Sequence, residues 1–454
     1  MKLQTAIATL LFTGAPVFCA ATTVTDNVTV DDRYQNASQQ LAIPIVKLDA
    51  GRFSTQVHFS NFKQNADGSY MANAHIEPLQ SLQDATDVRV DVGFDPQIAA
   101  NLQVFLEEQV SKNAKPGAIL RVDMNGKVWR GVIGKQRINS DQALNFSDRH
   151  RVGSISKTFV SNVIMQLVQE GILGLDTTID QYIPEVDIHN KDKITVRHLI
   201  NHRTGLYNYV KSVDQIQQSM QLDPLKVFTP YDLIAISNAQ PVDFEPGTQY
   251  KYSNTGLILA GLIIEKVTGQ DVEDVVYEKV LKPLNLQRTE FPKDPGIQSN
   301  YMHGQADYNN DGILESTEIV SYLDPSVSWA AGAVISNIPD LSRWSKAHID
   351  GELLTSELQQ QVLSDCLPSA PDYGASYCIG AVKLTWPFNT TDENNWWWGH
   401  LGQINGYDNA IFRNPKKDIT ISMVNTNYYL ETPPEMGTGI FIFEVLNIIE
   451  PQTA

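Results

Sequence analysis

The sequence has too little positive charge for a protein that binds polyanions. It contains 34 Lys and Arg residues against 52 Asp and Glu residues, which gives a formal net charge of -18 at pH 7. No basic tract offsets this excess. Because the long-range field of such a chain repels polyanions, nucleic acids and anionic membrane surfaces are disfavoured as partners.

Long apolar runs, repeats and low-complexity tracts are also missing. Beyond residue 21 no stretch reaches the roughly 18 apolar residues of a membrane helix, so we expect no membrane span. With 454 residues, of which 42% are hydrophobic, the chain is long enough for two or three globular domains and a sizeable core.

The apolar segment at the amino terminus is too short to span a bilayer and is typical of a signal peptide. Lys2 supplies its positive end, residues 6–17 the apolar run and residues 19–21 a small-x-small cleavage site. Cys19 alternatively suggests a lipoprotein site, but the bulky Phe18 precedes it where a small residue is expected. We expect residues 1–21 to be removed and the protein to be secreted or periplasmic.

Cysteine is scarce, and only Cys366 and Cys378 remain once residues 1–21 are cleaved. In an oxidising compartment an even pair favours a disulfide, so we predict that these two residues form one. The alternative is two free, buried thiols.

The order of predicted elements indicates two parts after the signal peptide. Residues 22–92 are rich in polar residues with alternating segments around a turn, which predicts a polar leader and a small β-rich accessory unit. Residues 93–450 run from helix and hairpin through mostly helical residues 172–300 to further strands and a last helix. This order predicts an α/β sheet domain with an inserted helical domain. Within the insertion, helix signals cover residues 196–201, 230–237, 256–268 and 271–280.

Ser154 and Lys157 stand at the start of a strongly patterned helix. Apolar residues recur at three and four positions over residues 160–168, so they share one buried face, and Gly171 ends the helix. Side chains at i and i+3 meet on a helix, so a desolvated Lys157 can take a proton from Ser154. The alternative is a first helical turn that merely contains both residues, since Ser60 and Lys63 have the same spacing in a predicted strand.

A second motif places Tyr252 and Asn254 between a Pro-Gly loop and an apolar helix. A phenol there can shuttle protons if neighbouring cations lower its pKa, and the amide of Asn254 can hold Lys157 and a substrate amide. The alternative is a core tyrosine followed by an asparagine in a turn.

A third motif runs from Trp398 through His400 and Gly402 to Gln403, ahead of a predicted edge strand. Its glycines allow close approach of a substrate backbone, and the N–H of Gln403 can pair with that of Ser154 as an oxyanion hole. The alternative is a surface histidine on a glycine-rich turn.

In this order the three motifs resemble those of the penicillin-recognising serine hydrolases, whose signatures are Ser-x-x-Lys, Tyr-x-Asn and Lys/His-x-Gly. The likeness is closest to exported D-alanyl-D-alanine carboxypeptidases and class C β-lactamases and covers residues 94–448, including residues 194–206 and 327–335. It implies an antiparallel sheet flanked by helices with an inserted all-helical domain. No Glu-x-x-Leu-Asn motif is present, which disfavours a class A β-lactamase.

The resemblance also implies the roles of the site residues. Ser154 would be the nucleophile and Lys157 its proton acceptor. Tyr252 would shuttle the proton to the leaving group, with Asn254 as positioner and His400 on the facing strand. No metal or other cofactor would take part in catalysis.

The sequence departs from this family where relatives bind a substrate carboxylate. Leu401 replaces a hydroxyl residue, and Val382 replaces an assisting arginine, while Lys383 is expected on the opposite strand face. Losing both anchors would leave a buried carboxylate unpaired. The aromatic run of residues 396–398 would then line an apolar pocket with Trp398, unless it is simply a buried strand.

The sequence therefore favours an exported serine hydrolase that forms an acyl-enzyme, first of all a D-alanyl-D-alanine carboxypeptidase-like peptidase. Its substrate would be a small peptide, such as a peptidoglycan stem peptide, or an ester. The alternatives are an esterase or another amide hydrolase and, in a different class, a non-hydrolysing penicillin-binding or scaffold protein. The oligomeric state stays open.

A separate signal predicts a structural calcium site at residues 307–318. The segment has the oxygen ligands, the central Gly312 and the closing glutamate of a twelve-residue calcium loop. The predicted ligands are Asp307, Asn309, Asp311, Ile313 through its carbonyl, Glu315 and Glu318. The alternative is an acidic hairpin, because no amphipathic helix precedes the loop as in a paired EF-hand.

Overall fold

The computed structural model describes residues 24–28, 45–50, 53–64, 70–76, 80–81, 89–90, 94–111, 115–217, 220, 222–305, 321–426 and 437–450, the first six ranges and 437–440 as backbone only. The predicted signal peptide and the predicted calcium loop at residues 307–318 lie outside the described residues.

The chain divides into two compact units, residues 1–84 and residues 85–454. The first contains a five-stranded antiparallel sheet in the order β1 (Val24–Val28), β4 (Tyr70–Ile76), β3 (Phe53–Gln64) and β2 (Ile45–Ala50), with β5 (Gln80–Ser81) also paired to β3. The two-residue strand β6 (Arg89–Val90) pairs with β8 of the second unit. The second unit therefore begins before residue 93, where the sequence pattern placed its start.

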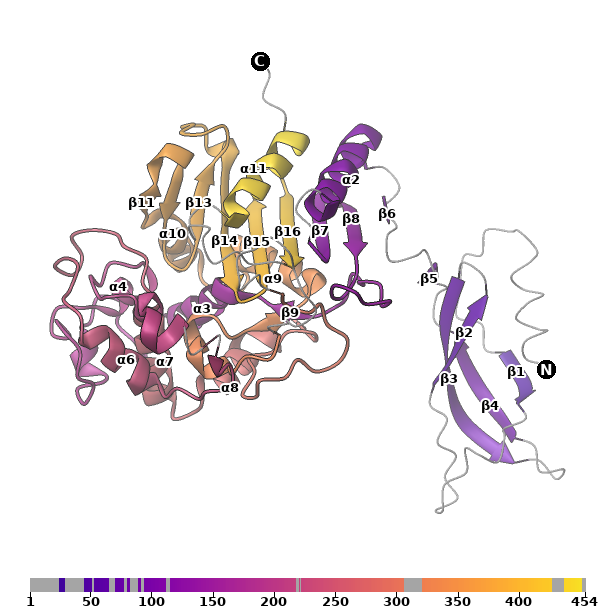
Figure 1. Cartoon of the computed structure of the whole chain (residues 1–454), viewed down its shortest axis with the longest axis horizontal. Helices are drawn as coiled ribbons and strands as arrows, with labels where there is room; N and C mark the ends of the chain where they lie inside the picture. Colours follow the sequence, from indigo (N-terminus) through magenta and orange to yellow (C-terminus); the bar gives the residue numbers. More distant parts are fainter. Residues whose placement is uncertain are drawn as a thin grey trace. The chain divides into compact units, whose positions relative to one another are not determined.

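A nine-stranded antiparallel sheet forms the body of the second unit (Figure 1). Its order is β11 (Leu367–Ala370), β12 (Ala375–Tyr377), β13 (Val382–Thr385), β14 (Trp396–Ile404), β15 (Tyr407–Asn414), β16 (Ile419–Thr426), β7 (Gly117–Met124), β8 (Lys127–Gly134) and β6. The pairing of β16 with β7 joins strands from opposite ends of this unit.

Helices cover both faces of this sheet. On one face α2 (Pro96–Ser111) and α11 (Gly437–Ile449) lie together over β7, β8, β14 and β15. On the other face α9 (Ile338–Asp350) packs on β7, β15 and β16; it begins where Asn337 accepts a hydrogen bond from the N–H of Asp340. The predicted antiparallel sheet flanked by helices is confirmed.

The inserted region is mostly helical and packs around the apolar helix α7 (Figure 1). Ten successive residues of α7, 255–264, are buried, so this helix forms the centre of the region rather than its surface. Its helices are α4 (Val196–Ile200), α6 (Pro230–Asn238), α7 (Asn254–Thr268) and α8 (Val272–Val276). The preceding helix α3 (Ser156–Gln169) packs against α7, and α10 (Ser356–Ser364) follows α9 in the chain. Within the described ranges, every helix falls short of the length or the apolarity that a bilayer crossing needs.

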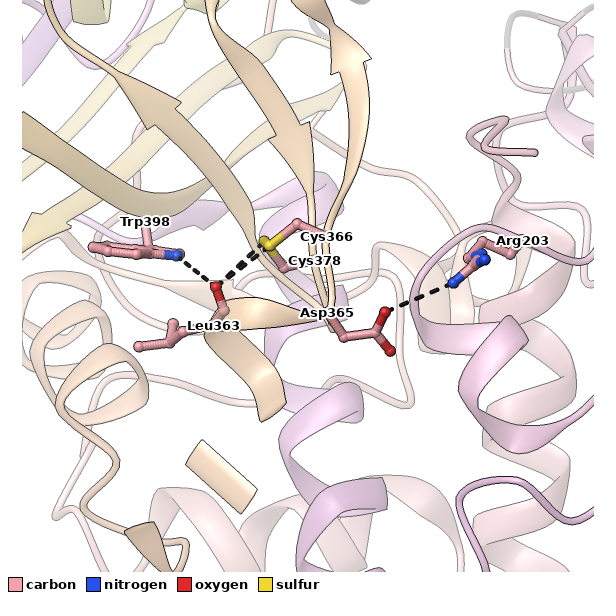
Figure 2. The surroundings of a disulfide bond; sticks show 6 residues. All are labelled: Arg203, Leu363, Asp365, Cys366, Cys378 and Trp398. Carbon is pink, nitrogen blue, oxygen red and sulfur yellow. Dashed lines mark hydrogen bonds and ion pairs between the residues drawn. A yellow bond between two sulfur atoms is a disulfide. The ribbon is translucent and has the colours of Figure 1, made fainter. Parts of the chain in front are cut away.

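The predicted disulfide between Cys366 and Cys378 is present (Figure 2). It joins the segment after α10 to the bend after β12. The neighbouring Asp365 forms ion pairs with Arg197 at 2.8 Å and Arg203 at 3.6 Å. The disulfide loop is therefore tied to the helical region at α4 and the residues after it.

Candidate active site

Ser154 lies in a short turn, Gly153–Ile155, that leads directly into α3. The turn requires a left-handed residue, and Gly153 supplies it with φ 53°. A Cβ on Gly153 would meet the carbonyl oxygen of Gln403 at 2.5 Å. The glycine therefore lets the backbone beside Ser154 lie directly against β14.

Lys157 is fully buried, with its amine beside the hydroxyl of Ser154. Its Nζ is 2.8 Å from Oγ of Ser154 and 2.6 Å from the carbonyl oxygen of Ala331. Burial lowers the pKa of Lys157 well below 10.5. A neutral amine at this distance can accept the proton of Ser154.

Tyr252 lies beside the same pair. Nζ of Lys157 is 5.0 Å from the centroid of its ring. Burial raises the pKa of Tyr252 above 10, although a hydrogen bond with Ser154 acts in the opposite direction. The condition named from the sequence, a pKa of Tyr252 lowered by neighbouring cations, is therefore not met. Tyr252 is a neutral phenol, which suits it to donate a proton to a leaving group.

Asn254 begins α7 and is held by another asparagine. Its backbone N–H and its side-chain Nδ2 both donate to Oδ1 of Asn208, each at 3.1 Å. The sequence predicted that Asn254 would hold Lys157, but the amine of Lys157 binds Ser154 and Ala331 instead. The structure thus places Asn254 at the site without that contact.

His400 is buried on β14, and both of its ring nitrogens have partners. Nε2 lies 3.0 Å from the hydroxyl of Tyr377, and Nδ1 is hydrogen-bonded to the carbonyl oxygen of Leu401. Burial lowers the pKa of His400 to about 3. The imidazole is therefore neutral at physiological pH.

Two aromatic residues that the motif analysis did not single out complete this group. The His202 ring lies 4.2 Å from that of Tyr252 and 4.4 Å from that of Tyr377, between centroids. Burial also lowers the pKa of His202 well below 6.5. His202 falls inside the segment 194–206 that carried part of the family resemblance, and Tyr377 begins the segment 377–382 that located Val382, but the sequence assigned no role to either residue.

Gly402 and Gln403 bring β14 against the nucleophile turn. A Cβ on Gly402 would lie 2.0 Å from the carbonyl oxygen of Val152, so only glycine fits there. Asn409, fully buried on β15, donates through Nδ2 to the carbonyl oxygens of Arg151 at 3.0 Å and Gly402 at 3.2 Å. This amide holds together the two segments that carry the predicted oxyanion donors, the N–H groups of Ser154 and Gln403.

The strand β14 is paired on both sides only at residues 398 and 399. Its pairing with β13 covers residues 396–399, whereas its pairing with β15 covers residues 398–404. Among the described strands none pairs with residues 400–404 on the β13 side. An extended substrate can bind along such an edge.

The structure buries Trp398, which the sequence analysis expected beside an apolar pocket. It is only 7% exposed and packs with Ile349, Cys378 and Ala381. Its indole N–H donates to the carbonyl oxygen of Leu363 at 3.3 Å (Figure 2). The aromatic run therefore belongs to a buried strand, which was the alternative interpretation.

Lys383 pairs in register with Trp398, and its Nζ lies 3.0 Å from the centroid of the Trp396 ring. Val382 faces the other side of the sheet, where it packs against the core beneath α2 and α11. Neither residue thus presents a charge at the turn that carries Ser154.

No cluster of three or more His, Cys, Asp or Glu side chains among the described residues could hold a metal ion.

Comparisons with known proteins agree with this geometry. A family model described as Beta-lactamase matches residues 102–442. Protein flp of Staphylococcus aureus strain MW2 is 24% identical over 355 residues, 75% of this chain and 66% of that protein, so the chain spans just under two thirds of its length. Penicillin-binding protein 4* of Bacillus subtilis strain 168 is 24% identical over 324 residues, 69% of this chain and 68% of that protein.

Solved structures show the same fold. A D-stereospecific amidohydrolase from Streptomyces sp. is similar with a TM-score of 0.67 and 26% identity, over 79% of this chain and 100% of that one. The D-amino acid amidase from Ochrobactrum anthropi SV3 is similar with a TM-score of 0.65 and 22% identity, over 78% of this chain and 98% of that one.

Proposed function

The chain belongs to the beta-lactamase family and is a serine hydrolase, and from this premise we propose that it hydrolyses amide bonds on the carbonyl side of a D-amino acid residue. D-alanyl-D-alanine carboxypeptidases cleave such a bond, and that activity remains the first expectation from the sequence. The names of the two similar solved structures, a D-stereospecific amidohydrolase and a D-amino acid amidase, support the D configuration.

The contact between Lys157 and Ser154, beside Tyr252, carries this proposal. Lys157 takes the proton of Ser154 as Oγ attacks the substrate carbonyl. The resulting oxyanion accepts hydrogen bonds from the N–H groups of Ser154 and Gln403. Tyr252 donates its proton to the leaving amine as the C–N bond breaks, and the proton held by Lys157 restores the phenol. Water then releases the acyl group by the same transfers in reverse.

Intact-protein mass spectrometry with a penicillin and with a fluorophosphonate tests this mechanism. We expect a covalent adduct on the wild-type protein that is absent in Ser154→Ala. A protein that forms no adduct with either reagent would instead be the non-hydrolysing scaffold.

Hydrolysis of esters is the second candidate function. It is favoured by Leu401, which offers no hydroxyl to a substrate carboxylate, and by Lys383, which lies over Trp396. Turnover of p-nitrophenyl acetate without any cleavage of D-alanyl peptides would establish this second candidate and remove the first.

Three further proposals rest on the sequence. The mature protein is secreted or periplasmic, its partner is a small peptide or ester substrate such as a peptidoglycan stem peptide, and residues 307–318 bind a structural Ca²⁺. Near the ends of that segment, the N–H of Gly304 donates to the hydroxyl of Ser321 at 3.0 Å.

A further inference from the structure

His400 has no ring nitrogen left for a substrate. The carbonyl oxygen of Leu401 only accepts hydrogen bonds, so Nδ1 of His400 carries the ring proton. In the neutral ring Nε2 holds the lone pair, and the hydroxyl of Tyr377 donates to it over 3.0 Å. Both ring nitrogens are therefore occupied by partners within the protein.

Tyr377 is held in this position from several sides. It ends β12, is 2% exposed, and lies one residue before the disulfide-bonded Cys378. Its ring centroid is 5.8 Å from that of Tyr250 and 4.4 Å from that of His202. A phenol packed in this way cannot easily turn away from His400.

The second histidine of the group is neutral as well. Nδ1 of His202 accepts a hydrogen bond from the backbone N–H of Ser253 at 3.3 Å, and the ring is 1% exposed. Protonation would therefore break this hydrogen bond and place a charge in a buried position.

The remaining cations on the segments that supply the site are bound elsewhere. Arg203 pairs with Asp365, as Figure 2 shows, and Lys251 pairs with Asp243. Lys383 lies over Trp396.

Arg151 is buried and donates to the backbone carbonyls of Ser321, Pro295 and Leu323. The residues between 115 and 450 that the structure does not describe, namely 218, 219, 221, 306–320 and 427–436, contain no Lys or Arg.

We infer that the leaving group of the substrate is uncharged, and that Tyr377 sets this specificity by occupying Nε2 of His400, so that this ring offers no hydrogen bond to a carboxylate. The inference rests on the proposed function and names the substrate class within it: peptide amides and other D-aminoacyl amides without a free carboxylate. A substrate carboxylate beside Leu401 would lose its hydration without gaining an ion pair.

Two peptides that differ in a single group test the inference. N-acetyl-D-Ala-D-Ala and N-acetyl-D-Ala-D-Ala amide are incubated with the full chain, and released D-alanine or D-alaninamide is quantified by chromatography and mass spectrometry. We expect kcat/KM for the amide to exceed that for the acid on the order of 100-fold. Equal or faster cleavage of the acid would overturn the inference and leave the proposed function standing. If neither peptide is cleaved, both the inference and the proposed function are refuted.

The role of Tyr377 has its own matched control. In Tyr377→Phe, Nε2 of His400 loses its partner and becomes free to hydrogen-bond a substrate carboxylate, so we expect the preference for the amide to fall about 10-fold. Tyr407→Phe removes another buried phenol, which donates to the carbonyl oxygen of Met302 at 2.8 Å, and should keep the wild-type preference. An equal fall in both variants, or in neither, would exclude a specific role for Tyr377.

Discussion

Replacing Gly402 by alanine should disable the site without unfolding the protein. The added Cβ would lie 2.0 Å from the carbonyl oxygen of Val152, whereas real Cβ contacts are essentially never shorter than 3.0 Å. The two segments must therefore separate by about 1 Å, which displaces the N–H of Gln403 from that of Ser154. A misplacement of that size costs on the order of 100-fold in rate, so we expect acylation by a fluorophosphonate to slow by about that factor.

The rate of adduct formation, followed by intact-protein mass spectrometry, measures this effect. Gly296→Ala is the matched control, because its Cβ would meet no atom closer than 3.5 Å. Thermal melts of both variants would show whether the fold is kept. If the Gly402 variant keeps its fold and acylates at the wild-type rate, close contact between β14 and the nucleophile turn is not what positions the oxyanion donors.

Three further predictions concern stability. Replacing Cys366 and Cys378 by serine should lower the free energy of unfolding by about 2–4 kcal/mol in urea titrations, because the disulfide closes a loop with a sequence separation of 12; an unchanged midpoint would contradict this. Lys157→Met should abolish the acyl adduct yet stabilise the fold by about 1 kcal/mol. Burial lowers the pKa of Lys157, so the wild-type protein must give up a proton to fold at low pH. The stabilisation of the variant relative to wild type should therefore be largest at low pH and fade as pH rises towards about 10. A variant less stable than wild type at pH 6 would refute this prediction. EDTA should lower the melting temperature, and Asp307→Ala should remove this sensitivity; identical melts with and without EDTA would end the calcium proposal.

Local patterns predicted the helices of the insertion well. The predicted helix at residues 230–237 corresponds to α6 (Pro230–Asn238), and that at residues 256–268 to α7 (Asn254–Thr268). The signal at residues 271–280 was read as one helix, whereas the structure has the short helix α8 followed by a π-helical turn at Tyr277–Leu281. Apolar spacing fixes which residues face the core, but it does not distinguish these two hydrogen-bonding patterns.

The site itself was predictable only where its geometry is local. Ser154 and Lys157 meet because helical spacing brings them together, and no tertiary information is needed. Tyr377 reaches His400 through the pairing of β12, β13 and β14, which depends on register and on the bend at residues 378–381. The direction of the pKa shift of Tyr252 likewise depends on burial, which the sequence around it does not reveal.

The pairing of β7 with β16 has a consequence for biosynthesis. The N–H of Gly117 donates to the hydroxyl of Thr426, 309 positions further along the chain. A ribosome adds roughly 5–20 residues per second, so β7 waits on the order of half a minute for its neighbour to be made. The nascent chain thus has a nucleophile long before it has an oxyanion hole, and hydrolysis can begin only after β14 and β16 have been made.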